Sequence, residues 1–235
     1  MTLQRILAIE TSSPRLSLAL GTDSHLLKEY QGPLQWRHAE SLFEGMQKLL
    51  AQARWSVQSL NGVLVSTGPG SFTGIRIGLA TARALGQALK IPVAGVSSLQ
   101  TIAFSMLKPG RFVCPLIDAL RGEVFTALYA MDSKGQVKTL WKECRLPWPE
   151  LARKLKPFNR EPLWFAGEAA ALYRKELQKL GGRRWRFAPK GNSYPRAGVL
   201  INIGRDGLSK AMATSYEEVL PLYLRSAAAV ERRKP

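Results

Sequence analysis

Residues 62–98, GVLVSTGPGSFTGIRIGLATARALGQALKIPVAGVSS, decide the fold class that this sequence predicts. The apolar run 62–65 has the length of a buried strand, and a glycine-rich turn follows it. Residues 75–90 contain no proline and are rich in Ala, Leu and Ile, so they predict a helix, which Pro92 ends before a strand at 93–96. This order is a βαβ unit whose turn lies at the carboxyl end of its first strand, where open α/β sheets usually bind ligands.

The turn is either a phosphate site or a plain strand-to-helix connection. Gly68 and Gly70 can take backbone angles closed to other residues, and Ser71 or Thr73 can cap the helix that follows. Free N–H groups at the start of a helix attract anions, so a phosphate is one prediction. The spacing matches neither the P-loop nor the dinucleotide G-x-G-x-x-G pattern, so a tight turn without a ligand is the alternative.

Small residues recur every four positions along the predicted helix and form one nearly smooth ridge, Gly74, Gly78, Ala82 and Gly86. An interior glycine costs a helix about 1 kcal/mol relative to alanine, so the absent side chains have a use. The expected use is close approach of another helix, packed ridge into groove. That helix belongs either to the same chain or to a partner, and we favour a partner.

Length and composition indicate a globular cytoplasmic protein. With 235 residues, of which 46% are hydrophobic, the chain can bury a core as one domain or two small lobes. It has no apolar run of about 18 residues, so no membrane span is expected. The first residues lack the apolar region and cleavage site of a signal peptide. Two cysteines, Cys114 and Cys144, are too few for a disulfide framework or a zinc site.

The net charge of +17 is unevenly distributed. Residues 1–105 hold 9 Lys/Arg and 5 Asp/Glu, whereas residues 106–235 hold 25 and 12. A basic field of this size favours polyanions, and RNA is the natural candidate; a solvated surface kept for solubility is the alternative. Trp185 and Phe187 interleave with the most basic run. The candidate RNA contacts are Arg174, Lys175, Arg183, Arg184 and Arg186.

The order of predicted elements suggests a duplicated α/β plan. Strands followed by helix, strand and helix occur in residues 1–105, and the same order restarts after the break at 108–110. We therefore predict an N-terminal lobe of residues 1–105 and a smaller basic lobe of residues 106–235. A last segment within 211–233 could pack back on the first lobe.

Several segments resemble one family, in the same order and over nearly the whole chain. They are ILAIETS at 6–12, RHAESL at 37–42, TGPGSFTGIRIG at 67–78, SSL at 97–99, IDA at 117–119 with Glu123 and Val124, and PLYLR at 221–225. The chain is similar to the TsaB (YeaZ) family, subunits of the bacterial machinery that makes threonylcarbamoyladenosine in tRNA. The segment at 67–78 is highly specific, and the region 141–193 is only weakly matched.

The resemblance implies two lobes of the actin/Hsp70/sugar-kinase (ribonuclease H-like) type, the second one degenerate. It implies a non-catalytic subunit that pairs with a larger paralogue, TsaD, and works with an ATPase, TsaE, on tRNA. The pairing would use the first-lobe helices, and free family members can form homodimers through a similar surface, so the chain alone is either a monomer or a homodimer. The interface residues so predicted are His38, Leu42, Met46, Gly74, Gly78, Ala82 and Gly86.

The same fold includes kinases, so an autonomous ATPase or sugar kinase is an alternative. Such enzymes need a carboxylate on the first strand to position Mg²⁺, and the candidate contacts to nucleotide or phosphate are Glu10, Thr11, Ser12, Gly68, Gly70 and Ser71. The segment 165–169 matches the adenosine-binding glycine pair of active kinases only faintly, and Leu120 stands where the family usually has a basic residue. We expect no cofactor of the chain's own, and ATP or ADP at the interface with the partner.

Two further alternatives are a metal enzyme and a stand-alone RNA-binding protein. The catalytic paralogue binds its metal through H-x-x-x-H, and here His38 is followed four residues later by Leu42. The other histidine is His25, and one histidine cannot hold a catalytic metal, so no metal site is predicted. A stand-alone RNA-binding module would bind tRNA tightly by itself with a steep dependence on salt.

Overall fold

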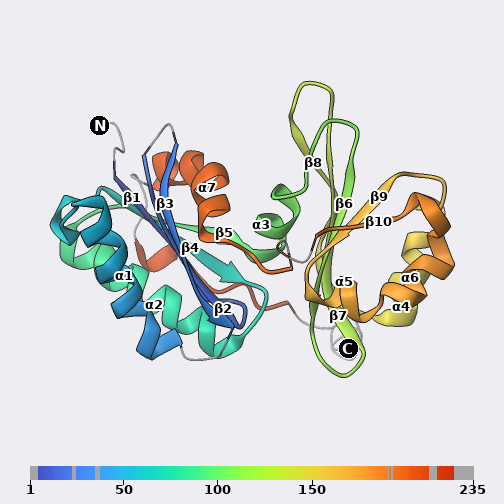
Figure 1. Ribbon diagram of the computed structural model, residues 1–235, viewed down its shortest axis with the longest axis horizontal. Coiled ribbons are helices and arrows are strands. Elements are labelled where there is room, and N and C mark those ends of the chain that lie inside the picture. The colour runs from blue at the N-terminus through green and yellow to red at the C-terminus, as the bar shows by residue number, and fades with distance from the viewer. Residues whose placement is uncertain are drawn as a thin grey trace, which may run out of the picture. The chain divides into compact units, whose positions relative to one another are not determined.

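The chain forms two compact units, each built on its own β-sheet (Figure 1). The computed structural model describes residues 5–22, 25–34, 38–189, 191, 193–211 and 216–224. Unit 1 comprises residues 1–101 and 195–222, and unit 2 comprises residues 102–194 and 223–235. This corrects the predicted division into 1–105 and 106–235, because residues 195–222 return to the first sheet.

Unit 1 carries a mixed five-stranded sheet in the order β3-β2-β1-β4-β5. β1 pairs antiparallel with β2 and parallel with β4; β2 and β3 are antiparallel, and β4 and β5 are parallel. The elements are β1 (Ile6–Glu10), β2 (Arg15–Gly21), β3 (Leu26–Leu34), α1 (His38–Ala53), β4 (Gly62–Gly68), α2 (Phe72–Leu89), β5 (Val93–Ser97) and α7 (Ala197–Ala211), and α3 (Ser98–Phe104) spans the boundary between the units.

Unit 2 repeats this topology in the order β10-β9-β6-β7-β8. β6 pairs antiparallel with β7 and parallel with β9, as β1 pairs with β2 and β4, and the outer pairs also correspond. Its elements are β6 (Phe112–Asp118), β7 (Glu123–Met131), β8 (Val137–Pro147), α4 (Trp148–Leu155), β9 (Leu163–Ala166), α5 (Glu168–Leu172), α6 (Arg174–Gly181) and β10 (Arg186–Phe187). The predicted fold class, two ribonuclease H-like α/β lobes, is confirmed.

Alternation along β1 produces two hydrophobic cores in unit 1, one on each face of the sheet. Leu7 and Ile9 point into the core that α1 and α2 cover, whereas Ile6 and Ala8 point into the core that α7 covers. Figure 1 shows α1 and α2 on one side of the sheet and α7 on the other. All five side chains of β1 are buried, which explains why the strand reads as a continuous apolar run up to Glu10.

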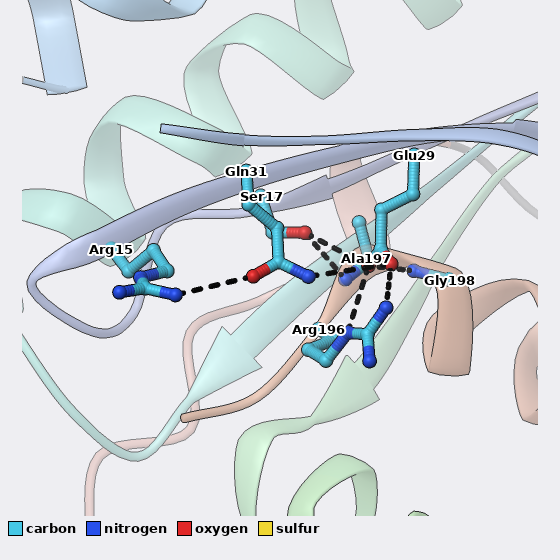
Figure 2. Close-up of polar contacts among 7 residues, drawn as sticks. All are labelled: Arg15, Ser17, Glu29, Gln31, Arg196, Ala197 and Gly198. Atoms are coloured by element: carbon cyan, nitrogen blue, oxygen red, sulfur yellow. Dashed lines mark hydrogen bonds and ion pairs between the residues drawn. The ribbon is translucent and has the colours of Figure 1, made fainter. Parts of the chain in front are cut away.

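The start of α7 is held by polar groups on β2 and β3, as Figure 2 shows. Ser17 Oγ accepts from the Ala197 N–H at 3.0 Å, and Glu29 Oε1 accepts from the Gly198 N–H at 3.0 Å. The Arg196 guanidinium donates to the Glu29 carboxylate, and the two form an ion pair. Burial acts to raise the pKa of Glu29, but hydrogen bonds from Arg196 and Gly198 and the charge of Arg196 hold it below the ordinary value.

Residues 216–222 also pack on unit 1. The Arg83 side chain of α2 donates to the carbonyl oxygens of Glu217 and Val219, and the Leu222 N–H donates to the Thr67 oxygen at 2.8 Å. The predicted last segment at 211–233 lies largely outside the described residues. The part that the structure describes begins with a short 3₁₀ turn at Tyr216–Glu218 and contacts α2.

Candidate functional site

The glycine-rich turn between β4 and α2 packs directly on the loop that follows β1. Ser71 caps α2 by accepting from the Gly74 N–H at 3.1 Å, which is one of the two caps that the sequence offered. The Ser71 N–H in turn donates to the Ser12 oxygen at 2.8 Å. Gly70 has a φ of +154°, and a Cβ there would lie 2.3 Å from the Ser12 oxygen, so only glycine fits this approach.

The Glu10 carboxyl lies at the centre of a buried cluster of serines. Its Oε1 accepts from both the N–H and the hydroxyl of Ser12, each at 2.6 Å. The Ser98 hydroxyl donates to Ser12 Oγ at 2.8 Å and lies 2.7 Å from the Ser66 hydroxyl. Burial raises the pKa of Glu10 even though the Ser12 hydrogen bonds act to lower it. Ser12 thus satisfies Oε1 of this carboxyl, whereas Oε2 is buried with no hydrogen-bond partner among the described residues.

The structure therefore brings all six candidate nucleotide contacts together. The three that come from the end of β1 and the loop after it, however, are buried inside the protein. Glu10 and Thr11 are fully buried and Ser12 is 3% exposed. The Thr11 hydroxyl donates to the Gly74 oxygen at 2.8 Å, which fastens the loop to α2. Gly70 and Ser71 are the partly exposed members. A carboxylate in this position cannot reach a Mg²⁺ ion in solvent while the cluster is intact.

The smooth ridge of α2 faces the protein's own core, which corrects its assignment to a partner interface. A Cβ on Gly74 would lie 2.0 Å from the Thr11 oxygen, and one on Gly78 would lie 2.3 Å from Thr11 Oγ1. A Cβ on Gly86 would lie 2.5 Å from Val93 Cγ2, and Ala82 is fully buried. The close approach that the small residues predicted is real, but it is made by a loop and a strand of the same unit.

The three predicted interface residues of α1 are buried as well. His38, Leu42 and Met46 are 3%, 1% and 6% exposed, and the two apolar side chains belong to the core under α1 and α2. The His38 ring contacts the Ser13 oxygen through Nε2 at 2.7 Å. Burial lowers the pKa of His38, against the opposing effect of that hydrogen bond. These side chains pack beneath α1, and of the three only His38 also lines the hollow at the start of α1 and α2.

Other residues of α1 and α2 do face solvent, and we call them the α1–α2 surface: Phe43, Phe72, Arg76, Ala80 and Ala84. Phe43 and Phe72 are 62% and 52% exposed, which is unusual for phenylalanine. The Arg76 guanidinium lies 3.8 Å from the centroid of the Phe72 ring. Sequence reasoning missed these residues because it followed the buried stripe of each helix; a phenylalanine beside that stripe, as at Phe43, was the available signal.

A hollow of about 420 Å³ adjoins this surface between the first turns of α1 and α2. Its lining consists of His38, Ala39, Glu40, Ser71, Thr73, Gly74 and Ile77. It is therefore the place where the capped start of α2 is accessible from outside.

In unit 2 the structure gathers part of the basic run around a second hollow, of about 730 Å³. The residues that line it are Trp164, Arg174, Gln178, Gly182, Arg183, Trp185, Arg186 and Phe187. Three of the five candidate RNA contacts are thus brought together. Arg184 instead donates to the Arg160 oxygen at 2.9 Å, and Lys175 is exposed but does not line the hollow. Trp164 was missed because it stands 10 residues before the first of these arginines.

The segment compared with an adenosine-binding pair packs on β6. A Cβ on Gly167 would lie 2.1 Å from the Leu116 oxygen, and Glu168 accepts from the Asp118 N–H at 3.1 Å. Burial raises the pKa of Glu168 to about 7. Leu120 is 68% exposed at a tight turn, with a φ of +63°. The Gly167–Glu168 turn therefore fastens α5 to the sheet.

Among the residues that the structure describes, no three His, Cys, Asp or Glu side chains lie close enough together to hold a metal ion. None of the helices that the structure describes is both long and apolar enough to cross a membrane.

Two sheets of the same mixed topology, with a glycine-rich turn after the fourth strand of the first, define a duplicated ribonuclease H-like α/β protein. Residues 33–232 match the family model described as TsaD, tRNA N6-adenosine threonylcarbamoyltransferase. The chain is 30% identical over 224 residues to the tRNA threonylcarbamoyladenosine biosynthesis protein TsaB of Bacillus subtilis, covering 95% of each chain. The chain belongs to the TsaB (YeaZ) family.

Two more similarities fit this assignment. The structure of YeaZ from Pseudomonas aeruginosa aligns with 94% of this chain and 100% of its own, with a TM-score of 0.77 and 25% identity. A tRNA N6-adenosine threonylcarbamoyltransferase of Geotalea uraniireducens is 27% identical over 104 residues, which are 44% of this chain and 30% of that protein. The chain is thus similar over 95% of its length to TsaB of Bacillus subtilis and over 44% of it to a transferase.

Proposed function

We propose that this protein is an accessory, non-catalytic subunit required for the formation of threonylcarbamoyladenosine in tRNA. The observation that carries the proposal is the similarity to TsaB of Bacillus subtilis over 95% of both chains. In this proposal the subunit pairs with a TsaD-like catalytic paralogue, cooperates with a TsaE-like ATPase, and acts on tRNA in the cytoplasm. The partial similarity to a threonylcarbamoyltransferase supports a paralogue as the partner.

The enclosed Glu10 cluster supports a subunit without nucleotide turnover of its own. A sugar kinase or ATPase of this fold needs an accessible carboxylate at the end of the first strand to position Mg²⁺. Here that carboxyl accepts two hydrogen bonds from Ser12 and is fully buried. We propose that the chain has no resident cofactor and that ATP or ADP is held only where Gly70 and Ser71 meet the partner.

The α1–α2 surface is the proposed contact with the paralogue, and with a second copy when the chain is alone. Phe43 and Phe72 present large apolar rings to solvent, and Ala80 and Ala84 form a low exposed row on α2 that lets another helix approach. The buried ridge of α2 supports this surface indirectly, because it fixes the helix against Thr11 and Val93.

The test is tRNA modification in a reconstituted mixture of the adenylate-forming enzyme, TsaD, TsaE and tRNA, with this chain present or omitted. Threonylcarbamoyladenosine is measured by mass spectrometry of the digested tRNA. We expect product only when this chain and TsaD are both present. Product without TsaD would make this chain the catalyst, and product without this chain would refute the proposed function.

A further inference from the structure

The hollow in unit 2 lies along the edge of the second sheet, where β10 is the outermost strand. Arg174 and Gln178 come from α6, Gly182 and Arg183 from the 3₁₀ turn Gly182–Arg184, and Arg186 from β10. In the register between β9 and β10, Arg186 pairs with Trp164, so their side chains leave the sheet on the same face. Phe187 pairs with Phe165 and leaves the sheet on the opposite face, so the lining of the hollow extends around the sheet edge that β10 forms.

Among the described residues, no carboxylate of this unit forms an ion pair with an arginine that lines this hollow. Residues 153–187 contain ten Lys or Arg and three Glu. Arg174, Arg183 and Arg186 are exposed, and none of the three forms an ion pair with a carboxylate among the residues that the structure describes. Unpaired arginines that line a hollow attract an anion with several charged groups and release its counterions.

The hollow also offers planar groups on which a base can stack. The Arg174 guanidinium lies 4.5 Å from the centroid of the Phe187 ring, and Phe165 stacks behind that ring at 5.7 Å. Phe165 is fully buried and therefore holds the Phe187 ring in place, while Arg174 on the other side of that ring remains exposed. Trp164, half-buried, is a second planar group in the lining, and Arg111 lies 4.3 Å from its ring centroid. Single-stranded nucleic acids bind to such aromatic rings and guanidinium planes.

We propose that this hollow binds single-stranded RNA, with one unstacked base on the Trp164 ring and the adjoining phosphates on Arg174, Arg183 and Arg186. A volume of about 730 Å³ is within the range of about 300–1,000 Å³ that takes small organic ligands, so a nucleotide fits. The Gln178 amide, which can donate and accept, reads the edge of the base. A duplex would offer its phosphates but not a base face.

An acidic peptide is the competing ligand, since carboxylates also pair with arginine. The planar lining favours the nucleotide, because a peptide of Asp and Glu has no group that stacks on Trp164. The proposal rests on the proposed function only for the origin of the RNA, which would be an unpaired segment of the tRNA substrate.

The experiment measures fluorescence anisotropy of a labelled 10-nucleotide single-stranded RNA with the purified full chain at several salt concentrations. The triple variant Arg174→Ala/Arg183→Ala/Arg186→Ala should reduce the slope of log affinity against log salt by about 2, because three phosphate contacts of about 0.7 each are lost. Trp164→Leu should weaken binding about tenfold and leave that slope unchanged, since it removes stacking but no charge.

The matched control is Lys134→Ala/Lys138→Ala/Lys142→Ala, which removes the same charge from exposed positions of the same unit. Loss of binding equal to that of the arginine triple would overturn the proposal in favour of a diffuse basic surface. A hairpin duplex that binds as tightly as the single strand would overturn it too, as would displacement of the RNA by an acidic peptide that binds more tightly. Thermal unfolding of each variant, with Trp164→Phe as the conservative form, separates lost binding from lost folding.

The reconstituted modification reaction keeps this proposal apart from the proposed function. If the reaction does not need the chain, the proposed function fails. Oligonucleotide binding by the chain alone then still shows whether the hollow binds single-stranded RNA. If the arginine triple binds the single strand like the unchanged protein, the hollow is refuted even where the chain is required for modification.

Discussion

At the scale of single residues, two desolvated carboxyls, Glu10 and Glu168, make the stability of the fold depend on pH. Glu10 is fully buried and accepts hydrogen bonds from Ser12, with Ser66 and Ser98 behind that serine, and Glu168 is half-buried against β6. Desolvation disfavours the charged form of each, so the pKa of both is raised. A desolvated carboxyl links folding to pH. Glu168 offers the cleaner test because its pKa in the folded chain lies near neutrality.

Glu168→Gln should remove a pH-dependent loss of stability. The carboxyl has a pKa of about 4.5 in the unfolded chain and of about 7 in the folded one. Stability therefore falls as pH rises from 4.5 through 7, by about 3 kcal/mol in the limit. The introduced glutamine would keep the oxygen that accepts from Asp118 and would carry no charge. Urea unfolding at pH 5 and pH 8 should show the variant gaining stability relative to the unchanged protein at the higher pH; parallel curves would contradict this.

Gly78→Ala should destabilise the isolated chain. The new Cβ would lie 2.3 Å from Thr11 Oγ1 in a loop fastened to α2, and such overpacking costs about 1–3 kcal/mol. The higher helix propensity of alanine offsets about 1 kcal/mol of that. The variant's unfolding midpoint in urea is the measurement, with Ala80→Ser, exposed on the same helix, as the control. Unchanged stability would mean that the ridge does not bear on the fold.

At the scale of elements, α1 and α2 have distinct inner and outer faces, and the outer one is the proposed partner surface. Ala84→Arg should break pairing with the paralogue and leave the chain folded, because Ala84 is exposed and a long cation would block close approach of another helix. We expect at least a tenfold weaker complex, about 1.4 kcal/mol, by titration calorimetry. Ala171→Arg, an equal change at an exposed position of α5, should have no effect; equal weakening by both would remove the α1–α2 surface from consideration.

The sequence predicted the positions of helices and strands far better than it predicted which side of a helix packs against the rest of the protein. The predicted strand at 62–65, helix at 75–90 and strand at 93–96 are confirmed as β4, α2 and β5, because apolar runs and Pro92 mark them locally. Tyr173 separates α5 from α6, and no apolar pattern in the sequence marks that break; the two-residue β10 is too short for any periodicity to detect. The glycine ridge indicated a close neighbour correctly, but its neighbour Thr11 is 63 to 67 positions away, and no local pattern encodes such a contact.

At the scale of the whole molecule, unit 1 is completed by α7, which lies far along the sequence from the strands that it covers. Glu29 and Arg196 are 167 positions apart, and their contact brings α7 onto the sheet face opposite α1 and α2. The same carboxylate accepts from the Gly198 N–H, so it also satisfies the first turn of α7. The charge of Glu29 is thus tied to the docking of α7 on the sheet.

Glu29→Gln should loosen this closure in a way that depends on pH. The pKa of Glu29 lies below its ordinary value of 4.5, so the carboxylate contributes stability that is complete above pH 4.5 and is lost as pH falls through the lower folded value. The side chain is partly exposed to solvent, which screens the pair, and we expect a cost of about 1 kcal/mol at pH 7. Hydrogen exchange of α7 at pH 7 and pH 4 is the measurement: protection should fall at pH 7 and approach that of the unchanged protein at acid pH. Lys48→Met, which breaks the exposed pair with Glu44, should leave α7 protected, and a variant indistinguishable from the unchanged protein at pH 7 would show that packing alone holds the helix.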